Sequence, residues 1–300
     1  MIQSVAVIGA GTMGNGIAHV FAQHGFDVTL IDLSEAQLKK ALSSIEANLG
    51  RQVSKGSISA EVKDAAMARL TTNTSIAEGV QSAQLVVEAA TEQTDIKLAI
   101  FKQVDAAAPP EAILATNTSS ISITKIAAVT RRAPLVIGMH FMNPVPVMKL
   151  VEVINGYATS SATTATIIAL SQQLQKTPCV VNDYPGFIAN RILMPMINEA
   201  IYSLYEGIAG VQEIDTVMKL GMAHPMGPLQ LADFIGLDVC LSILQVLQQG
   251  FGNPKYAPCP LLVNMVAAGK LGVKAGEGFY TYTAGSKELV VSARFSRQSL

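Results

Sequence analysis

Cysteine is scarce in this sequence. Its 300 residues contain three cysteines, Cys179, Cys240 and Cys259, with no CxxC pair and no cysteine or histidine spacing typical of a metal site. An odd number of cysteines without such spacing argues against a disulfide framework and against a structural zinc. We therefore expect a protein of a reducing compartment, the cytoplasm, that binds no metal.

An excess of charge of one sign is also absent, because 21 basic residues face 22 acidic ones. A chain so balanced lacks the broad positive field that nucleic acids and anionic membranes require. Residues 1–26 carry no charged side chain, but they contain five glycines and no basic segment, which argues against a signal peptide or a membrane span. We expect no nucleic-acid or membrane partner, and any anionic ligand must be held locally.

The order of the apolar runs predicts an α/β domain at the start of the chain. Short β-branched runs alternate with helix-compatible stretches, a pattern typical of a mostly parallel sheet with helices on both faces. The predicted strands cover residues 3–9, 27–32, 84–89, 112–116, 135–139 and 149–154, and the predicted helices between them cover 12–24, 94–107 and 122–129.

Two further patterns predict an inserted arm and a second domain. Residues 34–56 and 60–70 are polar and helix-compatible, with Ser34 as a helix cap before Gln37, so we expect a helical arm at 34–70. After Pro185 the apolar residues take a helical spacing, as at Ile188, Ile192, Ile197, Ile201 and Leu204. We therefore expect an amino-terminal domain at 1–184, an all-α domain at 185–283, and a tail at 284–300 of unknown role. The length of the whole chain is that of about two domains, which agrees with this division.

A glycine-rich turn joins the first predicted strand to the first predicted helix. In this GxGxxG, Gly9 permits the tight turn, Gly11 lets a pyrophosphate approach the backbone, and Gly14 allows close packing of helix on strand. Asp32 ends the second strand, where a carboxylate accepts hydrogen bonds from ribose hydroxyls and repels a 2′-phosphate. We expect a Rossmann-type domain that binds NAD through Gly9, Gly11, Thr12, Met13, Gly14 and Asp32, although such a turn also serves plain packing or a non-catalytic NAD sensor.

A histidine and a glutamate are the candidates for the chemistry. His140 follows the apolar run 135–139, at the edge where α/β sheets bind ligands, and Glu152 is enclosed by apolar residues in another predicted strand. A buried carboxylate needs a partner, and His140 is the candidate. If Glu152 accepts the Nδ1 hydrogen, Nε2 is the atom that takes a hydroxyl proton while hydride leaves for a nicotinamide. Alternatively, His140 is a hydrogen-bonded core residue and Glu152 faces solvent.

Two more polar groups have both a functional and a structural interpretation. Asn117 and Ser119 follow a predicted strand, where they can contact cofactor and substrate, or else this segment caps the helix that starts near 122. Asn190 lies on an apolar helix face, either as a satisfied core amide or facing a cleft.

The longest motifs resemble those of the L-3-hydroxyacyl-CoA dehydrogenases, and the resemblance runs from residue 3 to about residue 282. The motifs are ATNTSSISI at 115–123, GMHFMNPVPVMKLVEVI at 138–154, PGFIANRI at 185–192 and IDTVMKLGMAHPMGPLQLADFIGLD at 214–238. They are far more specific than a shared glycine turn. Among these enzymes, the free-standing length is most similar to the bacterial 3-hydroxybutyryl-CoA dehydrogenases.

This resemblance implies a role for each candidate residue. His140 is the catalytic base, Glu152 orients it, and Ser119 and Asn190 bond the reacting oxygen and the acyl group. Further NAD contacts are implied for Glu92, Lys97, Asn117, Ser119, Asn143 and Lys274. Glu92 and Lys97 are also compatible with an ordinary solvated helix face.

The resemblance further implies that the arm at 34–70 binds coenzyme A and that the helical domain forms a homodimer. Lys55 matches a lysine expected at the CoA phosphates, whereas Asn48 stands where a serine is expected. We expect reversible oxidation of a short-chain (S)-3-hydroxyacyl-CoA. The alternatives are a dehydrogenase of a free hydroxy acid or sugar acid on the same fold, and a non-catalytic NAD-binding protein.

Overall fold

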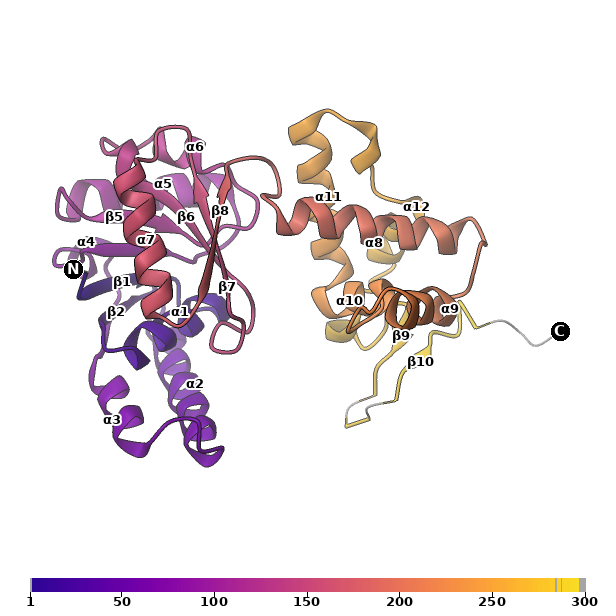
Figure 1. Cartoon of the computed structure of the whole chain (residues 1–300), viewed down its shortest axis with the longest axis horizontal. Coiled ribbons are helices and arrows are strands. Elements are labelled where there is room, and N and C mark those ends of the chain that lie inside the picture. The colour runs from indigo at the N-terminus through magenta and orange to yellow at the C-terminus, as the bar shows by residue number, and fades with distance from the viewer. Residues whose placement is uncertain (1, 284, 287, 297–300) are drawn as a thin grey trace. The chain divides into compact units, whose positions relative to one another are not determined.

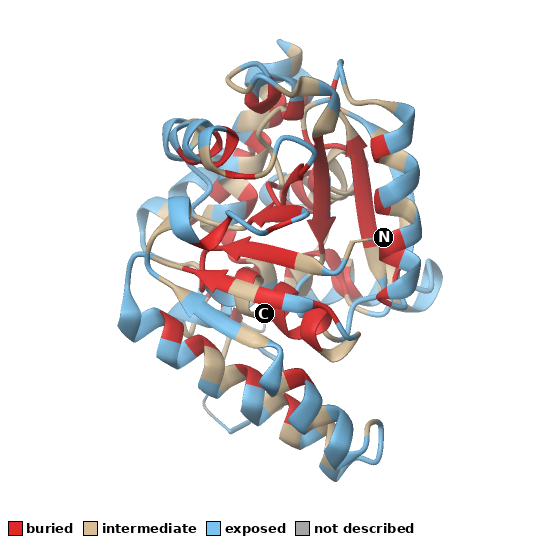
Figure 2. Ribbon diagram, turned by 90° about the vertical axis from the view of Figure 1, so that its left-hand side faces the viewer, coloured by how far each residue is buried: buried red, intermediate tan, exposed pale blue. Residues whose placement is uncertain are grey.

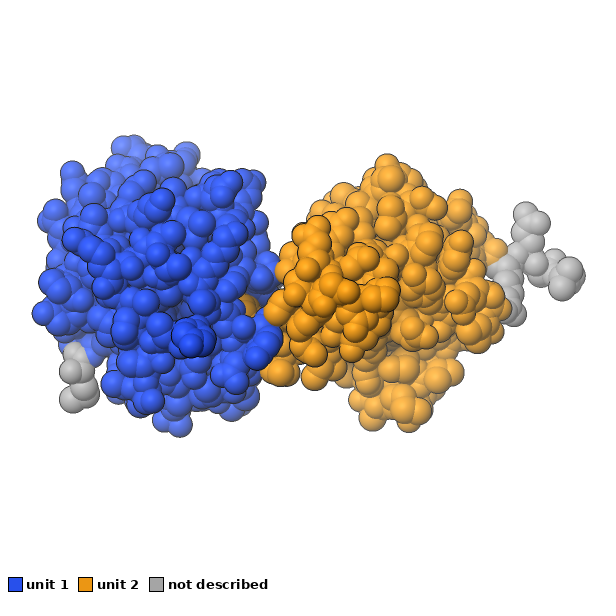
Figure 3. Space-filling model, turned by 90° about the horizontal axis from the view of Figure 1, so that it is seen from above, with its two compact units in different colours: residues 1–184 blue, residues 185–300 orange. Residues whose placement is uncertain are grey.

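The chain divides after Tyr184 into two compact units, residues 1–184 and 185–300 (Figure 1, Figure 3). The structure is a computed structural model that describes residues 2–283, 285–286 and 288–296. Each unit has its own hydrophobic core. Of the tail predicted at 284–300, residues 284, 287 and 297–300 lie outside the described residues.

An eight-stranded sheet organises the first unit, in the order β3-β2-β1-β4-β5-β6-β7-β8. All neighbouring strands are parallel except β6 and β7, which are antiparallel. The strands are β1 (Ser4–Ile8), β2 (Asp27–Ile31), β3 (Leu70–Asn73), β4 (Leu85–Glu88), β5 (Ile113–Thr116), β6 (Val136–Phe141), β7 (Leu150–Asn155) and β8 (Thr177–Asn182). The six strands expected from the sequence are confirmed, and the mostly parallel sheet with them.

The sequence prediction missed β3 and β8, the two edge strands. Only Leu70 of β3 lies in a predicted element, the helix at 60–70, and β8 lies outside every predicted element. Edge strands have few neighbours to bury them, and Figure 2 shows how the buried colouring is concentrated in the central strands. Both edge strands are largely exposed. β3 is mostly polar, and the apolar residues of β8 do not alternate with polar ones, so neither sequence carries the apolar periodicity that identifies a strand.

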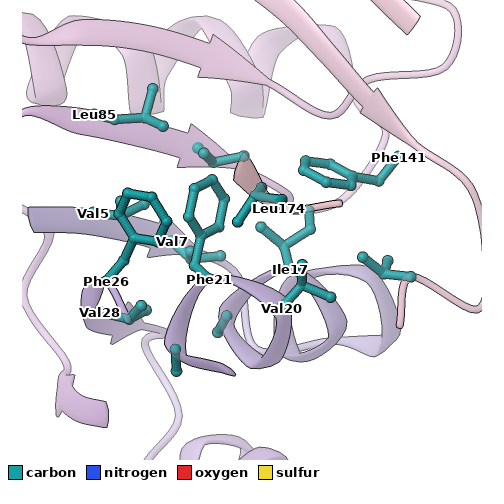
Figure 4. Packing of buried hydrophobic residues seen from close by; sticks show 14 of the residues in the cluster. Val5, Val7, Ile17, Val20, Phe21, Phe26, Val28, Leu85, Phe141 and Leu174 are labelled. Carbon is teal, nitrogen blue, oxygen red and sulfur yellow. The ribbon is translucent and has the colours of Figure 1, made fainter. Parts of the chain in front are cut away.

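Helices cover both faces of the sheet. α1 (Thr12–Gln23) and α7 (Ser161–Gln173) lie on one face, and α4 (Ile76–Gly79), α5 (Thr94–Ala107) and α6 (Ile123–Ala127) lie on the other (Figure 1). A 3-10 turn, η1 (Ala133–Leu135), precedes β6. In Figure 4, Phe21 of α1 lies beside Val7 of the sheet, and Ile17 lies towards Leu174 and Phe141. Burying a side chain of this size contributes about 1.5 to 3 kcal/mol, so this packing anchors the start of α1 beside β1.

The inserted arm is helical, as predicted, and consists of α2 (Glu35–Ser54) and α3 (Ala60–Ala68). The predicted cap is confirmed, because the backbone N–H of Gln37 donates to the Ser34 hydroxyl at 3.3 Å. Only one stripe of α2 is buried, formed by Leu38, Ala41, Ile45 and Leu49. The remaining face of α2 projects from the unit (Figure 1).

The second unit is helical apart from a small two-stranded sheet. Its elements are α8 (Ala189–Tyr205), α9 (Val211–Thr216), a π-helical turn η2 (Val217–Gly221), α10 (Pro228–Ile235), α11 (Leu237–Phe251), η3 (Pro254–Tyr256), α12 (Pro260–Ala267), η4 (Val273–Ala275), β9 (Tyr280–Thr281) and β10 (Val290–Val291). The helical spacing predicted after Pro185 is confirmed by α8, in which Ile197 and Ile201 are buried whereas Ile192 is 66% exposed. Among the described residues no single helix is long and apolar enough to cross a membrane, whereas the bent pair α10 and α11 together meets the length and composition required.

Candidate active site

The three glycines of the turn after β1 meet different surroundings. Gly9 has a φ of +100°, and a Cβ there would lie 2.7 Å from the carbonyl oxygen of Ala89. A Cβ on Gly14 would lie 1.7 Å from the carbonyl oxygen of Gly9, whereas a Cβ on Gly11 would have no atom within 4 Å. Gly9 and Gly14 are therefore required by the protein's own packing, and Gly11 keeps open the space in front of α1.

The start of α1 and the end of β2 form one cradle. Asp32 accepts hydrogen bonds from the backbone N–H of Ala10 at 2.8 Å and of Ser34 at 3.0 Å, which fixes its carboxylate beside the turn. Each carboxylate oxygen can accept more than one hydrogen bond, so hydroxyl groups of a ligand can still bind there. The cap residue of α1, Gly11, supplies no side-chain hydrogen bond to the first turn. A helix N-terminus with an open approach favours an anion, and the carboxylate favours a ribose, so these residues fit NAD.

His140 and Glu152 lie side by side on the antiparallel strands β6 and β7. The register places them opposite each other, and His140 Nδ1 is 2.8 Å from Glu152 Oε2. His140 is 9% exposed and Glu152 is 2% exposed, so the alternative of a glutamate facing solvent is wrong. A carboxylate can only accept, so the hydrogen of this bond resides on Nδ1. His140 lies inside β6, one residue before its end, rather than just after the strand as the sequence suggested.

A buried ion pair joins Glu88, at the carboxyl end of β4, to Lys97 of α5. Lys97 Nζ is 2.7 Å from Glu88 Oε1, and both side chains are 1% exposed. The hydroxyl of Thr116 donates to Glu88 Oε2 at 2.7 Å. The alternative that Lys97 belongs to a solvated helix face is therefore wrong.

Glu92 organises the loop that follows β5. Its Oε1 accepts hydrogen bonds from the Thr118 hydroxyl at 2.6 Å and from the backbone N–H groups of Ser119 at 2.9 Å and Ser120 at 3.1 Å. Lys97 Nζ lies 3.3 Å from its Oε2. Burial opposes the charge, but Lys97 and these hydrogen bonds outweigh burial and lower the pKa of Glu92. Glu92 is therefore an anion that holds this loop.

The polar segment after β5 does not cap the next helix. Asn117 Oδ1 accepts the backbone N–H of Phe141 at 2.8 Å and so ties the end of β5 to β6. The cap of α6 is Ser122, whose hydroxyl accepts the N–H of Lys125 at 3.2 Å. The capping alternative for Asn117 and Ser119 is wrong.

The other predicted residues are spread over both units. In the first unit, Asn143 is exposed in the loop after β6, Lys55 is exposed at the end of α2, and Asn48 accepts a hydrogen bond from Arg51. In the second unit, Asn190 is half-buried in the first turn of α8. Lys274, in η4, donates to Asp238 at 2.7 Å.

Sequence reasoning missed Glu88 and Thr116. The criterion that selected Glu152, a carboxylate enclosed in an apolar strand, also applies to Glu88 in the run Leu85-Val-Val-Glu88. A cavity of about 510 Å³ that includes Ile2, Gln84 and Ala112 lies at the amino ends of β1, β4 and β5. It is therefore at the sheet edge opposite His140 and takes no part in this site.

Comparisons with known proteins agree with this architecture. The family model described as "3-hydroxyacyl-CoA dehydrogenase, NAD binding domain" matches residues 4–184, and that described as "3-hydroxyacyl-CoA dehydrogenase, C-terminal domain" matches residues 186–282. The chain is 54% identical to the 3-hydroxybutyryl-CoA dehydrogenase of Bradyrhizobium diazoefficiens, over 94% of this chain and 96% of that protein.

Solved structures give the same result. The crystal structure of (S)-3-hydroxybutyryl-CoA dehydrogenase PaaH1 from Ralstonia eutropha has a TM-score of 0.92 at 50% identity, covering 94% of this chain and 100% of the other. A diketoreductase described as acting on dicarbonyl compounds has a TM-score of 0.82 at 28% identity, covering 94% and 99%. The chain belongs to the 3-hydroxyacyl-CoA dehydrogenase family.

Proposed function

We propose that the protein catalyses the reversible, NAD-dependent oxidation of a short-chain (S)-3-hydroxyacyl-CoA to the 3-oxoacyl-CoA. The observation that carries the proposal is the His140 Nδ1 to Glu152 Oε2 contact of 2.8 Å. It lies near the carboxyl end of β6, and the glycine turn lies at the carboxyl end of β1 in the same sheet. The short acyl chain is inferred from relatives named 3-hydroxybutyryl-CoA dehydrogenase.

In this proposal His140 is the general base. Because Glu152 accepts the Nδ1 hydrogen, Nε2 takes the proton of the substrate hydroxyl, and the carboxylate stabilises the imidazolium that results. NAD, when bound, supplies the acceptor for the hydride that leaves C3. The O–H and C3–H bonds break and a carbonyl forms. Ser119 and Asn190 are assigned to the reacting oxygen and the acyl group.

The proposed NAD contacts follow the cradle in front of α1. The backbone of the turn binds the pyrophosphate, and Asp32 binds the adenosine ribose. The residues assigned to NAD are Gly9, Gly11, Thr12, Met13, Gly14, Asp32, Glu92, Lys97, Asn117, Ser119, Asn143 and Lys274.

Alanine at Gly11 should separate NAD binding from folding. The Cβ of this alanine meets no protein atom within 4 Å, so the free energy of unfolding of G11A should lie within about 0.5 kcal/mol of that of the unmodified protein. The same methyl group occupies the space proposed for the pyrophosphate, so NADH titration should give a Kd at least about tenfold higher, which is about 1.4 kcal/mol. G14A is the contrast, because its Cβ clashes with Gly9 and should destabilise the fold. An unchanged Kd in G11A would contradict the proposed cradle.

A substrate panel tests the proposed reaction. NADH oxidation should be followed with acetoacetyl-CoA, longer 3-oxoacyl-CoAs and CoA-free 3-oxo acids, with NADPH as the control cofactor. The proposal expects the CoA thioesters and NADH to be preferred. Since Lys55 is exposed on the arm proposed to bind CoA, K55A should raise KM for acetoacetyl-CoA by a few fold, as expected for an exposed charge worth about 0 to 1 kcal/mol. Activity on the free acids with KM unchanged in K55A would instead support the hydroxy-acid alternative.

We also propose that the protein is a cytoplasmic homodimer formed through its second unit. Support for the dimer comes from exposed apolar side chains on that unit, among them Leu220, Met222 and Phe234. The three cysteines are free thiols, which supports a reducing compartment. Light scattering should give about twice the monomer mass of 31.6 kDa, and a mass of one monomer would contradict the dimer.

A further inference from the structure

We propose that Glu88 and Lys97 are positioning residues for Ser119, acting on it through Glu92 and Thr116. The inference rests on the proposed function, in which Ser119 binds the reacting oxygen of the substrate. It gives Lys97 a positioning role beside the NAD contact that is proposed for it above. Four observations within the first unit carry it.

The first observation is the register of the sheet. Glu88 is opposite Thr116, Thr116 is opposite Gly138, and His140 is opposite Glu152. Because side chains alternate along a strand, Glu88, Thr116 and His140 all project from the same face of the sheet, towards its carboxyl edge. The buried ion pair and the proposed catalytic pair are therefore parts of one layer.

The second observation is that protein oxygens surround the Lys97 ammonium. Its Nζ lies 2.7 and 3.0 Å from the two Glu88 oxygens, 3.3 Å from the carbonyl oxygen of Ala90, and 3.3 Å from Glu92 Oε2. An ammonium group has three hydrogens, and these four acceptors can engage all of them. A side chain 1% exposed in this setting orients its two carboxylate neighbours.

The third observation is that one oxygen of Glu92 gathers the loop after β5. Besides the backbone N–H groups of Ser119 and Ser120, the hydroxyls of Ser119 and Ser120 lie 3.3 Å and 2.9 Å from it. The bond from the Ser119 hydroxyl is the longest of these contacts. That hydroxyl can therefore turn to a substrate while the backbone bond at 2.9 Å keeps the residue in place.

The fourth observation is a second route from Glu88 to the same loop. The Thr116 hydroxyl donates to Glu88 Oε2 at 2.7 Å and accepts the backbone N–H of Thr118 at 3.2 Å. One route therefore runs through Lys97 and Glu92, and the other runs through Thr116. Both end on residues 118–120, so the Glu88 carboxylate determines where Ser119 stands relative to His140.

A double-mutant cycle on turnover tests this inference. In acetoacetyl-CoA reduction, E88Q should lower kcat by about 10- to 100-fold, the effect expected of a small misplacement at a reacting atom. NADH affinity should fall by less than kcat does, since the glycine turn and Asp32 are untouched and only the proposed NAD contacts of the loop after β5 are displaced. If Glu88 acts through Ser119, E88Q should lower kcat by less than about threefold further in the S119A enzyme, because coupled residues are non-additive. E111Q removes an exposed carboxylate from the opposite sheet edge and is the matched control, with kcat unchanged.

T116V is the second variant, and it carries the test if E88Q does not fold. It removes one hydroxyl and should lower kcat by about 3- to 10-fold. As with E88Q, this effect should be much smaller in the S119A enzyme, because coupled residues are non-additive. The inference would be overturned if E88Q or T116V lowered kcat by the same factor whether residue 119 is serine or alanine. It would also be overturned if kcat of E88Q stayed within twofold of that of the unmodified enzyme. Either result would leave the proposed function intact. Failure of the unmodified enzyme to reduce acetoacetyl-CoA would overturn both.

Discussion

Replacing His140 with alanine should lower kcat by about 10²- to 10⁴-fold, the range typical of a lost general base, while NAD affinity stays nearly unchanged. The proton of the substrate hydroxyl loses its acceptor, whereas the glycine turn and Asp32, proposed to hold NAD, follow β1 and β2 and are untouched. Turnover should be measured as NADH production from 3-hydroxybutyryl-CoA, and affinity by NADH titration.

Two variants sharpen this prediction. E152Q keeps the shape of the partner but removes its charge, so it should lower kcat less than H140A does, by about 10- to 100-fold, because the imidazolium loses its stabilising anion. H24A is the matched control, since His24 follows α1 and its ring Nδ1 bonds the backbone oxygen of Val20, away from the proposed catalytic pair. A kcat near that of the unmodified enzyme in H140A would remove this histidine from the mechanism.

Replacing Lys97 with methionine should destabilise the protein by about 3 to 5 kcal/mol, the usual effect of breaking a buried ion pair. The Glu88 carboxylate, 1% exposed, would lose the cation 2.7 Å from it and keep a buried charge. The loss should appear as a lower urea midpoint, followed by circular dichroism because the chain has no tryptophan.

The control for this change is on the same helix. K102M removes an exposed lysine from α5 and should alter stability by no more than about 0.5 kcal/mol. The double variant E88L/K97M removes both charges and should be more stable than K97M alone, since no uncompensated ion remains. A K97M protein as stable as K102M would show that the pair contributes nothing to the fold.

Several features of this protein follow from local sequence and were predicted from it. The strand, glycine turn and helix at its start depend on residues close together in the chain, so their spacing is sufficient to identify them. The same holds for the six central strands and for the arm with its cap at Ser34, which each carry an apolar periodicity or a capping signal. Glu152 was also identified locally, because a carboxylate in an apolar run demands a partner.

Other features were decided only by tertiary structure. The sequence suggested that His140 and Glu152 pair, but the antiparallel register of β6 and β7 sets their 2.8 Å contact, and register depends on strands that meet after folding.

The burial of Lys97 is the clearest example of a feature that local sequence does not predict. Its sequence neighbours allow a solvated helix face, and only the ends of β4 and β5 supply the oxygens that surround it. The edge strands β3 and β8 are similar, since half-exposed residues carry little periodic signal and become strands by pairing with a neighbour already in place. Local spacing therefore determined the elements and the suspected chemistry, whereas pairing between distant segments decided which side chains share a site.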